Sequence, residues 1–158
     1  GLPSDGRVLI ERAQLKAQQH RVTYDSPIDM LSIVKDISDL KQICTQSGGL
    51  RPFGVSILLA GIDGGEPKLF LTEPSGIYFR YYATAIGQSS DEINAILDKD
   101  YKKTMNIEQA TALGIKAIKK VLGANFQLDR VEAVYVAKEN PKFIVMSRED
   151  LKKLSKGD

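Results

Sequence analysis

The chain has 158 residues, of which 42% are hydrophobic and 27% are charged, and these values are typical of a globular protein with a substantial core. Its formal net charge of +2 gives no strong attraction to nucleic acid. A single cysteine and a single histidine exclude an intrachain disulfide and a Cys/His zinc site, and no apolar run approaches the length of about 18 residues that a membrane span needs.

Two amphipathic helices are predicted for the first part of the chain. The first should begin at Ser4, which can cap a helix, and should end near His20. The second should begin at Ser26 and end at Gly48, because glycine commonly terminates helices. We interpret His20 as an imidazole at a helix end rather than a base, and Cys44 as a small core residue rather than a nucleophile.

An uncharged run over residues 53–60 predicts a central strand. Its bulky residues share one face and its small residues share the other, so we expect the strand to be covered on both sides. Two turns then lead to strands over residues 68–72 and 77–85, which gives an antiparallel meander. The tyrosines and the arginine of residues 77–85 share a face that either contacts a partner or lies under a helix.

In the second half of the chain, predicted helices again precede predicted strands. Helices are expected after Ser89 or Ser90 and after Asn106, then a hairpin over residues 130–146, then a helix capped by Ser147. Gly114 lies inside the second of these helices at a cost of roughly 1 kcal/mol relative to alanine, so we expect close packing there. Because the strands come in hairpins, the sequence predicts an α+β fold with largely antiparallel sheets and helix layers outside sheet layers.

No motif in the chain carries chemistry by itself. Residues 61–65 form a hairpin turn rather than a phosphate-binding loop, because no helix follows them. The acidic pairs 91–92 and 149–150 lie in the first turns of predicted helices, where they complement the helix dipole. We therefore predict no catalytic residue, no metal site and no cofactor, and the patterning alone indicates a soluble domain of mixed helix and sheet.

Several segments, in order along the chain, resemble the α-type subunits of the 20S proteasome in their archaeal form. The most specific is Gly-Gly-Leu-Arg-Pro-Phe-Gly-Val-Ser-Ile-Leu-Leu-Ala-Gly-Ile-Asp, residues 48–63. The others are residues 1–9, 18–24, 73–76, 85–87 and 101–105. The resemblance runs the whole length of the chain and places residues 1–158, as a single domain, in the C-terminal two-thirds of such a subunit.

The resemblance implies a four-layer αββα sandwich of the N-terminal-nucleophile hydrolase type, incomplete at its N-terminal side. It implies a non-catalytic, cytoplasmic subunit of the α ring that caps the catalytic β rings and docks regulatory ATPases in protein degradation. The implied partners are sister α subunits in a heptameric ring, proteasome β subunits and an activator, with no nucleic acid and no membrane.

The resemblance also implies one binding site, for the C-terminus of an activator. Gly1 and Leu2 match the Gly-Leu of that site, but its lysine belongs to the part of the family that this chain does not match, so we expect a half-site at best or a plain loop. We expect the chain to be a fragment, with sheet edges left open. An active amide hydrolase of the same fold needs Thr, Ser or Cys at a processed N-terminus, which Gly1 contradicts. The third alternative is a stand-alone truncated paralogue used as an interaction domain.

Overall fold

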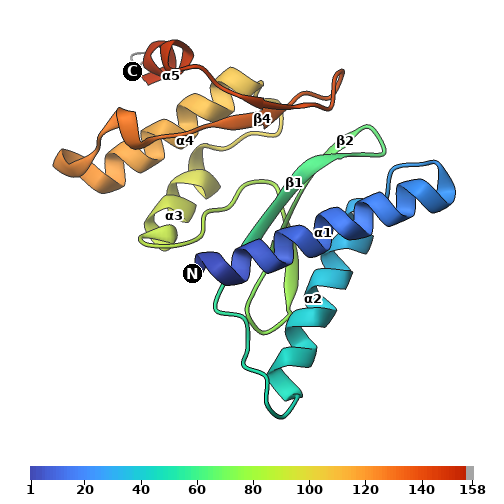
Figure 1. Cartoon of the computed structure of the whole chain (residues 1–158). Helices are drawn as coiled ribbons and strands as arrows, with labels where there is room; N and C mark the ends of the chain where they lie inside the picture. Colours follow the sequence, from blue (N-terminus) through green and yellow to red (C-terminus); the bar gives the residue numbers. More distant parts are fainter. Residues whose placement is uncertain (156–158) are drawn as a thin grey trace. The chain divides into compact units, whose positions relative to one another are not determined.

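The structure, a computed structural model, describes residues 1–155, which form an α+β chain whose elements follow the predicted order (Figure 1). The helices are α1 (Pro3–Tyr24), α2 (Met30–Gln46), α3 (Ser90–Asp100), α4 (Ile107–Leu122) and α5 (Arg148–Ser155), with 3₁₀ turns at Gly123–Asn125 and Leu128–Arg130. The strands are β1 (Ile57–Asp63), β2 (Glu66–Thr72), β3 (Tyr78–Tyr81), β4 (Val134–Val136) and β5 (Phe143–Val145). The chain divides into two compact units, residues 1–81 and residue 82 onward, and each has buried apolar residues of its own.

The first unit contains a three-stranded antiparallel sheet in the order β1-β2-β3, which confirms the predicted meander. Gly64 and Gly65 connect β1 to β2 with φ values of 60° and 75°, a left-handed backbone that glycine adopts without strain. The Glu73–Gly76 turn connects β2 to β3, and Glu73 N donates to the carbonyl of Ile77 at 2.9 Å. Strand β3 ends at Tyr81, four residues earlier than predicted.

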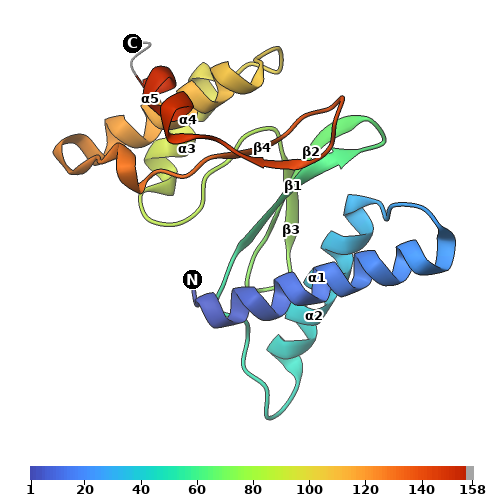
Figure 2. The same cartoon turned by 45° about the horizontal axis from the view of Figure 1, so that its top comes forward.

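Helices α1 and α2 form the helical layer of this unit. Helix α2 contacts all three strands, and Figures 1 and 2 both show α1 crossing α2. An ion pair between Arg12 Nε and Asp36 Oδ2 at 2.7 Å joins the two helices. Val34 and Ile37 of α2 are fully buried, as the predicted apolar stripe requires.

Both helices of the first unit differ from the prediction at their ends. Helix α1 begins at Pro3 rather than Ser4 and continues to Tyr24, where Asp25 adopts a left-handed backbone with φ of 50°. Helix α2 begins after Asp29 rather than at Ser26, and the Asp29 carboxylate accepts a hydrogen bond from Ser32 N at 2.9 Å. Asp29 is as good a capping residue as Ser26, and its position three residues later leaves Pro27 in the connecting segment.

Within the first unit, helices cover only one of the two faces that the prediction expects to be covered. Paired residues of a sheet lie on the same face, and the register pairs Leu58 with Leu71 and Leu71 with Phe79. On this face Leu58 is 37% exposed and Phe79 is 44% exposed, whereas the opposite face packs on α2. The Tyr81 side chain, on the same face as Phe79, is also exposed.

The second unit contains α3, α4, α5 and the antiparallel hairpin β4–β5 (Figure 2). Helix α4 packs on both α3 and α5, and its buried residues are Leu113, Ile115 and Ala117. Asn106 caps α4 with the reciprocal hydrogen bonds to Gln109 that the sequence predicts. Arg148, the first residue of α5, donates to the carbonyl of Asp129 at 2.6 Å and so fixes α5 to the preceding 3₁₀ turn.

Candidate functional site

The predicted half-site, Gly1 and Leu2, lies where the chain enters α1. Leu2 precedes the first helical residue with an extended backbone, φ −81° and ψ 115°. Its amide donates to the carbonyl of Gly54 at 2.9 Å, and its own carbonyl accepts from Gly6 N at 3.2 Å. The structure therefore fixes Leu2 against the segment before β1, which lies about fifty residues away in the sequence.

Asp5 fixes the same segment through its carboxylate. Arg51 donates to Asp5 with NH1 to Oδ2 at 2.7 Å and NH2 to Oδ1 at 2.8 Å, a two-point geometry, and Gly54 N donates to Oδ2 at 2.9 Å. The Arg51 guanidinium and then the Gly54 amide hold the pKa of Asp5 at about 2, below its usual 3.8. Asp5 is buried, while the Arg51 side chain is 64% exposed.

Close backbone approach requires glycine at position 1, whereas a side chain on Gly54 would have to displace the Leu2 side chain. A Cβ atom on Gly54 would lie 2.8 Å from Leu2 Cδ1, and one on Gly1 would lie 2.6 Å from the Gly54 carbonyl oxygen. Both distances are shorter than any normal contact, and the second atom is backbone that cannot move aside. The Gly1–Leu2 pair and the segment around Gly54 therefore pack directly against each other.

This geometry limits what the half-site can offer a ligand. The Leu2 amide is already bonded to Gly54, so Leu2 presents its side chain, which is 48% exposed, rather than a free N–H group. The Arg51 guanidinium is a cation at this site, but the Asp5 carboxylate already neutralises its charge. Gly1 and Leu2 thus provide an apolar contact through the Leu2 side chain.

Lys41 is the polar residue that the sequence interpretation missed. It is fully buried on the α2 face that covers the sheet, and its Nζ donates to Val55 O at 3.0 Å, Thr72 O at 3.0 Å and Thr72 Oγ1 at 2.7 Å. Burial lowers the pKa of Lys41 to about 8, and the charge of Glu73 opposes the shift. The available signal was spacing, because position 41 continues the apolar positions 34 and 37 toward 44.

The interpretations of His20 and Cys44 agree with the structure. His20 lies in the last turns of α1, its Nδ1 is 3.1 Å from the Ser26 carbonyl oxygen, and its ring contacts Tyr24. Cys44 is buried on α2 with 9% of its surface exposed. Neither residue belongs to a nucleophile–base pair among residues 1–155.

The acidic pairs also occupy their predicted places. Asp91 and Glu92 lie in the first turn of α3, and Glu149 and Asp150 lie in the first turn of α5. No cluster of three or more His, Cys, Asp or Glu side chains that could hold a metal ion occurs among the described residues. None of the helices within residues 1–155 combines the length and the apolar character that crossing a membrane requires.

Comparison with known proteins gives similarity over almost the whole chain. A family model described as "Proteasome subunit" matches residues 1–136. The chain is 45% identical over 152 residues to "Proteasome subunit alpha" of Saccharolobus solfataricus and to the protein of that name in Saccharolobus islandicus, and 42% identical over 153 residues to that of Sulfurisphaera tokodaii. These matches cover 95% of the chain, which spans 63% of the length of each relative.

Proposed function

Because the chain belongs to the proteasome subunit family, we propose that it is a structural, non-catalytic subunit of the α ring of the 20S proteasome. The observation that carries the proposal is the 45% identity over 152 residues to proteins named proteasome subunit alpha. The chain spans 63% of their length, and its function in an assembled particle is therefore inferred from them. A cytoplasmic location and a role in protein degradation follow from the same inference.

The absence of catalysis is supported by the surroundings of the candidate groups. Cys44 is buried on the face of α2 that packs on the sheet, so its thiol is closed to a substrate. The Nδ1 atom of His20 faces a backbone carbonyl rather than a hydroxyl or thiol. A hydrolase needs a nucleophile within hydrogen-bond reach of its base, and the described residues offer no such pair around His20.

For the fold, we propose that residues 1–158 are a single domain that forms the four-layer αββα sandwich of the N-terminal-nucleophile hydrolases, incomplete at its N-terminal side. Each of the two units supplies helices and an antiparallel sheet, the components of this architecture. The exposed apolar face of the β1–β2–β3 sheet supports the proposal, because a four-layer fold covers both faces of each sheet.

The proposed partners are sister α subunits in a seven-membered ring, proteasome β subunits and an activator. Gly1 and Leu2 are proposed to form half of the site for the activator's C-terminus, with Leu2 giving an apolar contact. The unmatched cation that a carboxylate needs would come from outside the described residues, since Arg51 is paired with Asp5.

The test is the native mass of the chain, measured by size-exclusion chromatography with light scattering, alone and with an archaeal proteasome β subunit. The proposal expects either a ring-sized species of about seven copies or a complex with the β subunit. A chain that stays monomeric and leaves the β subunit unbound would overturn the proposal for this chain. Hydrolysis of a fluorogenic peptide by the chain alone would overturn its non-catalytic part.

A further inference from the structure

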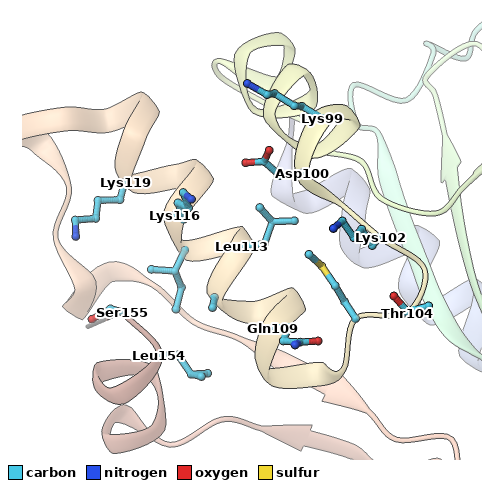
Figure 3. Close-up of a pocket in the computed structure, with 13 residues that line it drawn as sticks. Lys99, Asp100, Lys102, Thr104, Gln109, Leu113, Lys116, Lys119, Leu154 and Ser155 are labelled. Atoms are coloured by element: carbon cyan, nitrogen blue, oxygen red, sulfur yellow. The ribbon is translucent and has the colours of Figure 1, made fainter. Parts of the chain in front are cut away.

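The second unit contains a cleft of about 630 Å³ lined by the end of α3, the connection from α3 to α4, helix α4 and the end of α5 (Figure 3). This volume lies within the range of about 300–1,000 Å³ that is usual for ligand sites. The cleft is built from residues 99–155 only, so its shape is set inside one unit of the chain. Nothing in the proposed ring function uses it.

The lining of the cleft carries a local excess of positive charge. Lys99, Lys102, Lys116 and Lys119 line it, with Asp100 as the one acidic lining residue, an excess of three positive charges in a chain whose net charge is +2. Figure 3 shows Lys116 and Lys119 on α4 and Lys99 at the end of α3. Among the ion pairs of residues 1–155, none involves any of these lysines.

Helix dipoles explain the presence of only two of these four lysines. Lys99 and Lys119 lie in the last turns of α3 and α4, where a cation is favourable. Lys116 lies a turn further inside α4, and Lys102 lies in the connection between the helices, so neither has this explanation. Like charges gathered around one cleft repel each other, and an anionic ligand would remove that repulsion.

The same cleft has apolar residues between its lysines. Leu113 and Ile115, which are 6% and 4% exposed, belong to the α4 core, and Met105, Ala112 and Leu154 add apolar surface at the cleft. A small inorganic anion uses only the lysines and leaves this surface uncovered. A peptide with carboxylates on either side of one apolar side chain can use both parts.

We propose that this cleft is a docking site for an acidic peptide segment of a partner protein. One leucine-sized side chain of the peptide contacts Leu154 and the α4 residues, and neighbouring carboxylates pair with Lys116 and Lys102. The lysines give attraction and orientation, and the apolar contact excludes water and gives specificity. This inference does not depend on ring assembly, because every residue involved belongs to one unit of one chain.

The test uses the full chain and a short fluorescein-labelled peptide with a central leucine flanked by glutamates, with binding followed by fluorescence anisotropy. We expect saturable binding that weakens at least tenfold in Lys116→Glu and weakens as salt screens the charges. Lys120→Glu is the matched control, since it makes the same charge change on the same helix at a residue outside the cleft. Equal weakening in both variants, or no binding at low salt, would overturn the proposal.

A second arm keeps the chain unchanged and varies the probe. A peptide with serine in place of the central leucine should bind at least about fivefold more weakly, because it loses the burial of an apolar side chain. If the two peptides bind equally, the site recognises charge alone and the proposed apolar contact is wrong. If light scattering instead shows that the unliganded chain is a dimer and that Lys116→Glu dissociates it, the cleft is occupied by a second copy of the chain. The peptide proposal then fails.

Discussion

Lys41 places an ammonium group in the apolar core of the first unit without a carboxylate partner at ion-pair distance among the described residues. Its three hydrogen bonds all go to oxygens of Val55 and Thr72, so they connect α2 to β2 and to the segment before β1. Such bonds replace lost hydration only in part, which is why burial lowers the pKa of the group to about 8. Lys41 therefore fixes the helix on the sheet at a cost that depends on pH.

This cost predicts an unusual alkaline stabilisation. The unfolded chain holds the Lys41 proton up to about its ordinary pKa of 10.5, whereas the folded chain releases it near 8, so the unfolded state binds more protons between these values. Wild type should therefore gain unfolding free energy relative to Lys41→Met as the pH rises from 8 to 10.5. Urea unfolding across this range measures the difference, with the exposed Lys35→Met as control. A difference that does not change with pH would show that the Lys41 pKa is unshifted.

Asp5 predicts the opposite pH behaviour at the start of α1. Its pKa is held at about 2 by Arg51 and the Gly54 amide, so its stabilisation is complete above the ordinary value of 3.8 and is lost as the pH falls toward 2. Asp5→Asn should therefore be less stable than wild type at neutral pH, and the two should converge at about pH 2. Thermal unfolding at several acidic pH values measures this, and Asp39→Asn, an exposed change on α2, should show no such convergence. If Asp5→Asn is still less stable than wild type at pH 2, the lost stability comes from packing rather than from the charge of Asp5.

The order of elements could be predicted from the sequence because helix and strand periods are local properties. The beginning of β1 could not, since residues 53–56 alternate like a strand but have no strand partner in the described sheet. Both backbone groups of Gly54 are bonded to the start of α1, to Leu2 and Asp5. A contact between positions about fifty residues apart thus replaces sheet pairing, and hydrophobic period carries no information about it.

The same limit applies to the candidate site. The family resemblance selected Gly1 and Leu2, but it did not predict that the Leu2 amide is already bonded or that Arg51 is matched by Asp5. Lys41 was missed because a lysine at an apolar position normally extends to water. Its burial depends on three oxygens from other segments, which only the folded chain brings together.

Helix α4 contains a glycine that the structure does not explain by packing. The predicted close contact at Gly114 is wrong, because a Cβ atom there would meet no atom within 4 Å in the described structure. Gly114→Ala should therefore raise the free energy of unfolding by roughly 0.5–1 kcal/mol through the helix propensity of alanine. Gly123→Ala is the matched contrast, since its φ of 52° makes alanine strained and should lower stability. Urea unfolding of both variants measures this, and a loss at Gly114→Ala would mean that another surface covers that side of α4.

At the scale of the whole molecule, helix α1 leaves a stripe of apolar side chains open to solvent. Val8, Leu15 and Val22 lie seven residues apart, so they share one side of the helix, and they are 51%, 51% and 87% exposed. Single exposed apolar residues need no explanation, but a row along a 22-residue helix is the pattern by which helices pack on other helices. We therefore expect this stripe to contribute to the subunit contacts of the proposed ring.

The last prediction places one charge in the middle of that stripe. Leu15→Glu should abolish the larger species in the native-mass measurement, because the contact would bury an unpaired carboxylate. It should leave the unfolding free energy within about 0.5 kcal/mol of wild type, since the side chain is already half exposed. Gln14→Glu adds the same charge at the neighbouring exposed position and should assemble normally. If Leu15→Glu assembles as well as Gln14→Glu does, the subunit contacts lie on another surface. Peptide binding in the second unit should be unchanged in both variants, which separates the two surfaces.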